Sequence, residues 1–320
     1  MFSILGKSPI IYSKKNSLKK SILYQYLCLL AVVVFTISNA ATALAAADSN
    51  LYIPRPGTPV AGSEAAVNAP VISADAAIMI DRENGEVLYS KNPDKREYPA
   101  STTKIMTAIL TIEDNHNDDD VVVSYNAANV ESTNLVPGEV MRRFDMLELM
   151  MLNSDNGAAT ALGESVAGSE HGFVTMMNNK AKALGALSTN FYNCNGMPNA
   201  QHYTTARDMS KIADYAMNNK LFRRVVSTDK KIIPYISPAH ASLKVENTNE
   251  LLKAYPDIIG VKTGYTRAAK GCLVAVATRE GKELLVVVFH SDTMDTRFQE
   301  ARKLLDYGFE LINERKVMAI

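Results

Sequence analysis

The order of apolar and polar residues predicts β-strands at both ends of the folded part of the chain. Residues 77–81 and 86–90 are predicted strands that flank Asn84-Gly85, a pair typical of the tight turn of a β-hairpin. A second hairpin turn is predicted at residues 280–282. Three later apolar runs have the length of buried strands, and they comprise residues 258–266, 272–278 and 284–289.

The middle of the chain has the apolar spacing of helices instead. A short run at residues 121–123 predicts one more strand, but the block at residues 141–219 is mostly helical in pattern. The individual helices predicted are residues 101–113, 173–184, 206–217 and 295–313. We therefore expect an α/β protein of the α+β type, with an antiparallel sheet covered by helices. Residues 74–100 and 255–320 would supply the sheet, and an inserted helical subdomain would occupy about residues 125–225.

The N-terminal 47 residues have the three parts of an export signal. Four lysines between residues 14 and 20 precede an apolar run at residues 27–37, and Ala43-Leu44-Ala45 fits a cleavage site. The apolar run is shorter than the ~20 residues that span a bilayer comfortably, so a cleaved signal is favoured over a retained anchor. Membrane contact is expected only through this segment, if it stays uncleaved.

A linker rich in proline, glycine and alanine follows at residues 48–73, so the folded domain is expected at residues 74–320. The export signal places this domain outside the cytoplasm, either secreted or associated with the membrane or cell wall. ATP and nicotinamide cofactors are scarce there, which argues against a kinase or a dehydrogenase.

Composition removes further classes of function. The formal net charge is zero, which gives no reason to expect nucleic acid as a partner. The histidines and cysteines lack the spacing of a zinc site, so no metal is expected. Cys194 and Cys272 could pair, but a buried free thiol is the prediction for each.

Candidate chemistry begins with Ser101 and Lys104, which stand three residues apart at the predicted start of a helix. This spacing puts both side chains on one face. A hydroxyl becomes a useful nucleophile when a neighbouring base takes its proton, and a lysine can be that base if burial lowers its pKa. The pair alone is also what a capping serine and a solvated lysine would give, so further parts of a site are needed to decide.

Two more polar clusters occur downstream. Ser154-Asp155-Asn156 lies between two helical stretches, where a turn with a helix cap is the alternative. Lys262-Thr263-Gly264 lies on a predicted strand, where Gly264 suggests the close approach of a ligand or another backbone. Lys262 would be unusual in this apolar strand unless it pointed into a polar site.

Together, in this order, the three motifs resemble those of low-molecular-mass penicillin-binding proteins of the D-alanyl-D-alanine carboxypeptidase family. The likeness extends from about residue 76 to the C-terminus. It includes four further stretches, residues 136–139, 195–198, 202–208 and 247–252. The resemblance implies the transpeptidase fold that penicillin-binding proteins share with β-lactamases, and it implies no cofactor.

The activity that the resemblance implies is acyl transfer on peptidoglycan stem peptides ending in D-Ala-D-Ala, with β-lactam antibiotics as inhibitors. Ser101 would attack the D-Ala-D-Ala peptide bond, and Lys104 would take its proton. Ser154 and Lys262 would relay a proton to the departing D-alanine. Asn156 would hold Lys104 and the substrate amide. Thr102 and Thr103 receive no role beyond the helix.

The resemblance also suggests how the substrate is held. The backbone N–H groups of Ser101 and Tyr265 would bind the oxyanion, and the substrate would add as a strand beside the Lys262 strand. The terminal carboxylate would meet Lys262 and Thr263. Arg297 lies where the family has an arginine that can face the site, and a surface arginine at a helix start is its alternative.

Three other functions remain to be weighed. A β-lactamase of class A needs a glutamate for deacylation, and Glu164 and Glu170 lie too close to the Ser154 motif to match that arrangement. A non-catalytic peptidoglycan-binding or regulatory protein could keep the fold, but all three motifs are intact here. A transpeptidase or an endopeptidase would use the same site and differ only in acceptor or bond.

Overall fold

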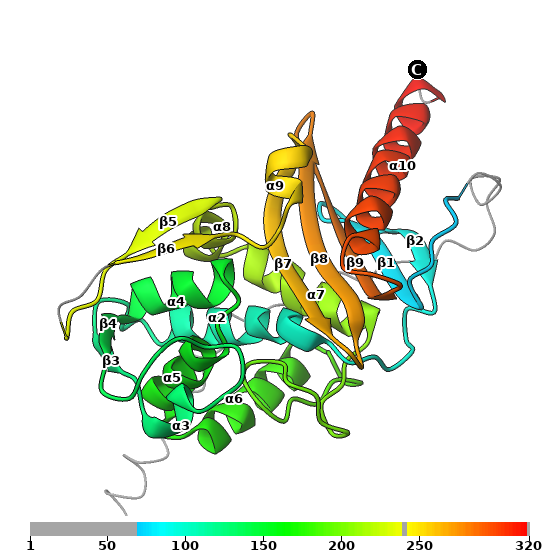
Figure 1. Ribbon diagram of the computed structural model, residues 1–320. Coiled ribbons are helices and arrows are strands. Elements are labelled where there is room, and N and C mark those ends of the chain that lie inside the picture. Colours follow the sequence, from blue (N-terminus) through cyan, green and yellow to red (C-terminus); the bar gives the residue numbers. More distant parts are fainter. Residues whose placement is uncertain (1–68, 239–241, 319–320) are drawn as a thin grey trace, which may run out of the picture. The chain divides into compact units, whose positions relative to one another are not determined.

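The computed structural model describes residues 69–238 and 242–318. The predicted export signal and most of the predicted linker lie outside these residues. The main sheet has five antiparallel strands in the order β2-β1-β9-β8-β7 (Figure 1). Their bounds are Ala76–Asp81 (β1), Val87–Lys91 (β2), Ile258–Thr266 (β7), Lys270–Arg279 (β8) and Lys282–Ser291 (β9). All five strands were predicted, β7 at its observed bounds and the other four with ends shifted by one or two residues.

The sheet joins the two ends of the folded part, as the sequence predicts. Strand β1 pairs with its hairpin partner β2 along one edge and with β9 along the other, where Ala77 of β1 lies opposite Val288 of β9. The second predicted hairpin, β8–β9, turns at Glu280-Gly281, where Gly281 has a φ of 76°. Strand β7 stands last in the order, so among the described residues its outer edge has no strand partner in this sheet.

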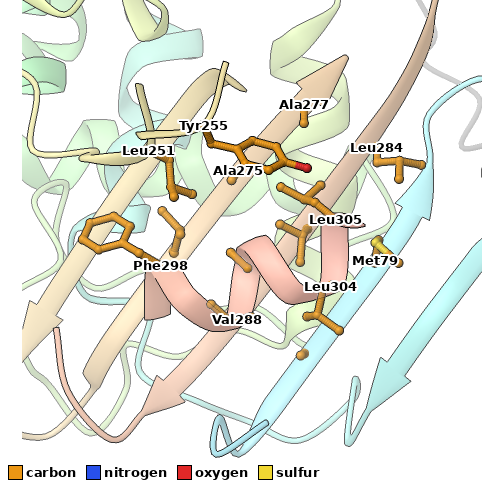
Figure 2. Close-up of a cluster of buried hydrophobic side chains, with 14 of the residues drawn as sticks. Met79, Leu251, Tyr255, Ala275, Ala277, Leu284, Val288, Phe298, Leu304 and Leu305 are labelled. Carbon is orange, nitrogen blue, oxygen red and sulfur yellow. The ribbon is translucent and has the colours of Figure 1, made fainter. Parts of the chain in front are cut away.

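The core lies on both faces of the sheet, because successive side chains of a strand point to opposite faces and both sets are buried. On one face, Val288 and its neighbours pack against α10 (Thr296–Met318), which contributes Phe298, Leu304 and Leu305 (Figure 2). Alternate residues such as Val287 are equally buried, on the opposite face. Helix α10 runs five residues beyond the predicted end at residue 313.

The remaining helices fill the middle of the chain. They are α2 (Lys104–Glu113), α3 (Tyr125–Ala128), α4 (Arg143–Leu152), α5 (Asn156–Ala167), α6 (Glu170–Ala183), α7 (Ala206–Met217), α8 (Lys220–Val226) and α9 (Leu251–Ala254). Side-chain caps start several of them: Asp155 begins α5, Ser169 begins α6 and Thr205 begins α7. Helix α2 is almost wholly buried and packs against α4, α5 and α7.

Two small sheets differ from the prediction. Met141 belongs to strand β4 (Val140–Arg142), which pairs with β3 (Asp120–Val122), so the helical block begins two residues later than expected. The hairpin of β5 (Lys230–Ile233) and β6 (Leu243–Glu246) was not predicted. Each of these two strands buries only one side chain, so its alternation is too weak to recognise in the sequence.

Cys194 and Cys272 are both buried free thiols, as predicted. Within the described part of the chain, no helix combines the length and the apolar character needed to cross a membrane.

Candidate active site

Ser101 lies on a tight turn that leads into α2. Residues Ala100–Thr103 form a 3₁₀ turn (η3), and the α-helix begins at Lys104, three residues later than predicted. In a 3₁₀ turn, side chains three residues apart eclipse one another, which is an even closer alignment than an α-helix gives. Lys104 Nζ accordingly lies 3.0 Å from Ser101 Oγ.

Lys104 is fully buried and has three polar partners. One partner is Ser101. To the other two, Asn156 Oδ1 and the backbone oxygen of Asn195, Nζ donates hydrogen bonds of 2.6 Å each. The two carbonyl oxygens can only accept hydrogen bonds, so they take two hydrogens of the amine. A neutral amine has only two hydrogens, and its lone pair is then left facing the Ser101 hydroxyl.

Burial favours this neutral form. Desolvation lowers the pKa of Lys104 to about 7, against the smaller opposing effects of Cys194 and Asp155. The predicted lowering of the Lys104 pKa by burial is therefore confirmed. The pKa of Lys262 is also lowered well below its usual value, first by burial and then by the charges of Lys104 and Arg297.

The Ser154–Asn156 stretch lies where α4 ends and α5 begins. Ser154 has a φ of 62°, and Asp155 caps α5 by accepting the backbone N–H of Ala158 at 2.8 Å. Asn156 uses both ends of its amide, because Nδ2 donates to the backbone oxygen of Glu131 at 2.8 Å while Oδ1 holds Lys104. The motif therefore serves both purposes, because Asp155 caps a helix while Asn156 belongs to the site.

Strand β7 passes close to the Ser101 turn at Gly264. A Cβ atom at this position would lie 3.0 Å from the backbone nitrogen of Ser101 and 3.1 Å from the backbone oxygen of Pro99. The close approach predicted at Gly264 is therefore made by another stretch of backbone, that of the Ser101 turn. Lys262 on the same strand is buried, and its Nζ donates to the backbone oxygen of Thr263 at 3.1 Å rather than to Ser154.

An open cleft of about 860 Å³ runs between these elements. Ser101, Ser154, Asn156, Thr263, Gly264, Tyr265 and Arg297 all contribute to its lining. Arg297 is 7% exposed and donates through Nη1 to the backbone oxygen of Gly264 at 2.8 Å, so the surface alternative for this arginine is wrong. Lys104 and Lys262 lie behind the wall of the cleft, fully buried.

Two parts of the structure beside the site received no role from the sequence. Thr248 lies beside Thr263, with 2.6 Å between the two hydroxyl oxygens. The second part is residues 192–196, which we call the acceptor loop because Asn195 accepts from Lys104. Gly196 ends this loop with a φ of 95°, and a Cβ there would lie 2.0 Å from the backbone oxygen of Ala100. Asn195-Gly196 is a turn signal, but its partner could not be identified from spacing.

Comparison with known proteins supports the resemblance. The sequence profile of the family described as D-alanyl-D-alanine carboxypeptidase matches residues 63–293. D-alanyl-D-alanine carboxypeptidase DacF of Bacillus subtilis is 37% identical over 74% of this chain, which spans 62% of that relative's length. D-alanyl-D-alanine carboxypeptidase of Streptomyces sp. (strain K15) is 35% identical over 80% of this chain and 94% of its own.

Among solved structures, the DD-transpeptidase of Streptomyces K15 matches with a TM-score of 0.71 and 33% identity, over 76% of this chain and 99% of that one. This likeness confirms the predicted transpeptidase fold of the penicillin-binding-protein type. The chain belongs to the D-alanyl-D-alanine carboxypeptidase family. The predicted family is thus confirmed.

Proposed function

We propose that this chain is a serine-type D-alanyl-D-alanine carboxypeptidase that removes the terminal D-alanine from peptidoglycan stem peptides. The observation that carries the proposal is the set of partners around Lys104. Two carbonyl oxygens occupy its hydrogens and leave its lone pair for Ser101, at 3.0 Å, while burial lowers its pKa to about 7. An activated hydroxyl in an open cleft is what acyl transfer needs.

The reaction would begin with attack of Ser101 Oγ on the carbonyl carbon of the D-Ala-D-Ala peptide bond, as Lys104 takes the hydroxyl proton. The bond to the terminal D-alanine breaks, and its nitrogen receives a proton by way of Ser154 and Lys262. Water then hydrolyses the Ser101 ester. The backbone N–H groups of Ser101 and Tyr265 would hold the oxyanion at both stages.

Substrate binding is proposed on the same cleft. The free outer edge of β7 offers the backbone groups to which an extended stem peptide could add. The terminal carboxylate would meet the paired hydroxyls of Thr248 and Thr263, with the Arg297 guanidinium close by. β-Lactams would acylate Ser101 in place of the peptide and act as inhibitors.

The alternatives have weaker support. Among the described residues that line the cleft, the carboxylates are Glu131 and Asp155. Asp155 is used as a helix cap, and Glu131 is exposed. A class A β-lactamase needs a buried glutamate beside the ester, so slow deacylation of β-lactams is expected. Transpeptidation or endopeptidation would use the same residues with another acceptor or bond.

The proposed location is outside the cytoplasm, where peptidoglycan is. The export signal predicted at residues 1–47 supports this location, and its cleavage would release the protein from the membrane.

The direct test is incubation of the purified protein with a pentapeptide ending in D-Ala-D-Ala, followed by mass analysis of the products. We expect a tetrapeptide and free D-alanine. Addition of a second peptide amine separates the related activities, because a transpeptidase would yield a cross-linked product. Unchanged pentapeptide, with no adduct of labelled penicillin on the protein, would leave only the non-catalytic alternative.

The pH dependence follows from the pKa of Lys104. Only the neutral amine can accept the Ser101 proton. The acylation rate is therefore expected to fall about tenfold for each pH unit below about pH 7, which gives the pH–rate profile an acid limb. The rate should rise through this limb and level off above it. The measurement is the second-order rate of penicillin acylation between about pH 5 and pH 9. A rate that stayed flat down to about pH 5 would argue against Lys104 as the base.

A further inference from the structure

His202 is a buried histidine that the proposed reaction does not use. Its side chain is 1% exposed, and its Nδ1 accepts the backbone N–H of Tyr192 at 3.1 Å and that of Asn193 at 3.4 Å. Because Nδ1 accepts, the hydrogen of the neutral ring is on Nε2. Nε2 lies 2.8 Å from Thr103 Oγ1 and donates to it. The imidazole therefore connects the acceptor loop to the end of the Ser101 turn.

Other contacts join the same loop to α2. Thr107 Oγ1 donates to the backbone oxygen of Cys194 at 2.6 Å. Thr103 and Thr107 are four residues apart and so lie on one face of the helix. Lys104, between them in sequence, donates to Asn195. At the end of the loop Gly196 packs directly on Ala100. Each residue from 192 to 196 thus either forms a hydrogen bond with His202 or contacts the Ser101 turn or α2.

We propose that His202 is a positioning residue, which holds the acceptor loop against α2 and so fixes the Asn195 carbonyl that takes one hydrogen of Lys104. The proposal rests on the function proposed above. If the loop shifted, that hydrogen would lose its acceptor, and the amine could turn its lone pair away from Ser101. Small losses of alignment between a base and a nucleophile lower rates strongly.

The electrostatics of the histidine agree with this role. Burial, and then the charge of Lys104, lowers the pKa of His202 to about 4. The ring stays neutral while Lys104 titrates, so Nδ1 remains an acceptor for the loop. The other titratable groups that influence Lys104 or respond to its charge are Cys194 on the loop, Asp155 before α5 and Lys262 on β7.

Two substitutions break the connection from opposite sides. His202→Asn keeps an oxygen near the place of Nδ1 for the loop, but its side chain is too short to reach Thr103. Thr103→Val keeps the shape of threonine and removes the hydroxyl, leaving the bonds between His202 and the loop in place. We expect each variant to lower the maximal rate of acylation by labelled penicillin about tenfold, with a much smaller change in the half-saturating concentration.

Two further readouts distinguish positioning from simple loss of stability. Water that reaches Lys104 past a loosened loop would raise its pKa, so the acid limb of the acylation rate should move to higher pH in both variants. The double variant should be about as slow as either single one, because both break the same connection. Thr103→Ser, which keeps the hydroxyl, should retain most of the wild-type rate.

The control is His116→Asn, at an exposed histidine in the loop after α2, which should keep the wild-type rate and pH limb. Wild-type rates and an unmoved limb in Thr103→Val would overturn the proposal even if His202→Asn failed to fold. Lower melting temperatures with unchanged rates would overturn it too. Failure of the proposed function is distinguishable, because the wild-type protein would then neither be labelled by penicillin nor release D-alanine.

Discussion

Replacing Ser101 with alanine is expected to abolish both penicillin labelling and D-alanine release, by a factor of about 10⁴ or more. The substitution removes the only atom to which the acyl group would be attached. It leaves Lys104 with both of its carbonyl partners, and the substituted side chain lies on the wall of an open cleft. The measurements are a labelling gel with fluorescent penicillin and mass analysis of the pentapeptide products.

The matched control is Ser227→Ala, because Ser227 is an exposed serine at the end of α8. This variant should label and turn over like the wild type. Thermal melting of both variants should match that of the wild type, since neither change removes buried apolar surface. Persistent labelling of the Ser101→Ala protein would show that another residue is the nucleophile, and the proposed mechanism would then be wrong.

The second large effect is expected from Lys104→Met, which keeps an unbranched side chain and removes the amine. The rate of acylation should fall about 10³-fold, because the Ser101 hydroxyl loses its base. The residual rate should also lose the acid limb near pH 7, since that limb is assigned to Lys104. The pH profile of the variant is therefore more informative than its rate alone.

Stability needs a separate measurement for this variant. Methionine leaves Asn156 Oδ1 and the Asn195 oxygen without their hydrogen-bond donor, which costs about 1–3 kcal/mol for each buried group. Assays should therefore be run well below the melting temperature of the variant. Lys303→Met on the exposed side of α10 is the control and should change neither rate nor profile. A Lys104→Met protein with a wild-type rate would exclude Lys104 as the base.

Much of the sheet could be predicted because its signals are local. The strand at Ile258–Thr266 was placed at its observed bounds, and the hairpin at Asn84-Gly85 was recognised from its turn residues. The β5–β6 hairpin was missed for the opposite reason. Each of its strands buries only one side chain, so no short stretch of sequence carries a clear pattern.

The site was predicted to a similar extent. Ser101, Lys104, Asn156, Thr263, Gly264 and Arg297 were all singled out, and the structure brings them together around one cleft or directly behind its wall. Thr103 was assigned no role, yet its hydroxyl contacts His202, 99 residues away along the chain. The Asn195 carbonyl belongs to a backbone that any residue would supply, so no residue type in the sequence could point to it.

The sequence alone was sufficient for the strands of the main sheet, the main helices, the order of the three motifs, and the spacing that aligns Ser101 with Lys104, because each depends on residues close together in the chain. Only the tertiary structure decided the chemical state of that pair. The pKa of Lys104 depends on burial, and the direction of its lone pair depends on two oxygens that lie 52 and 91 residues further along the chain. Such contacts follow from how helices and loops pack, which local spacing does not specify.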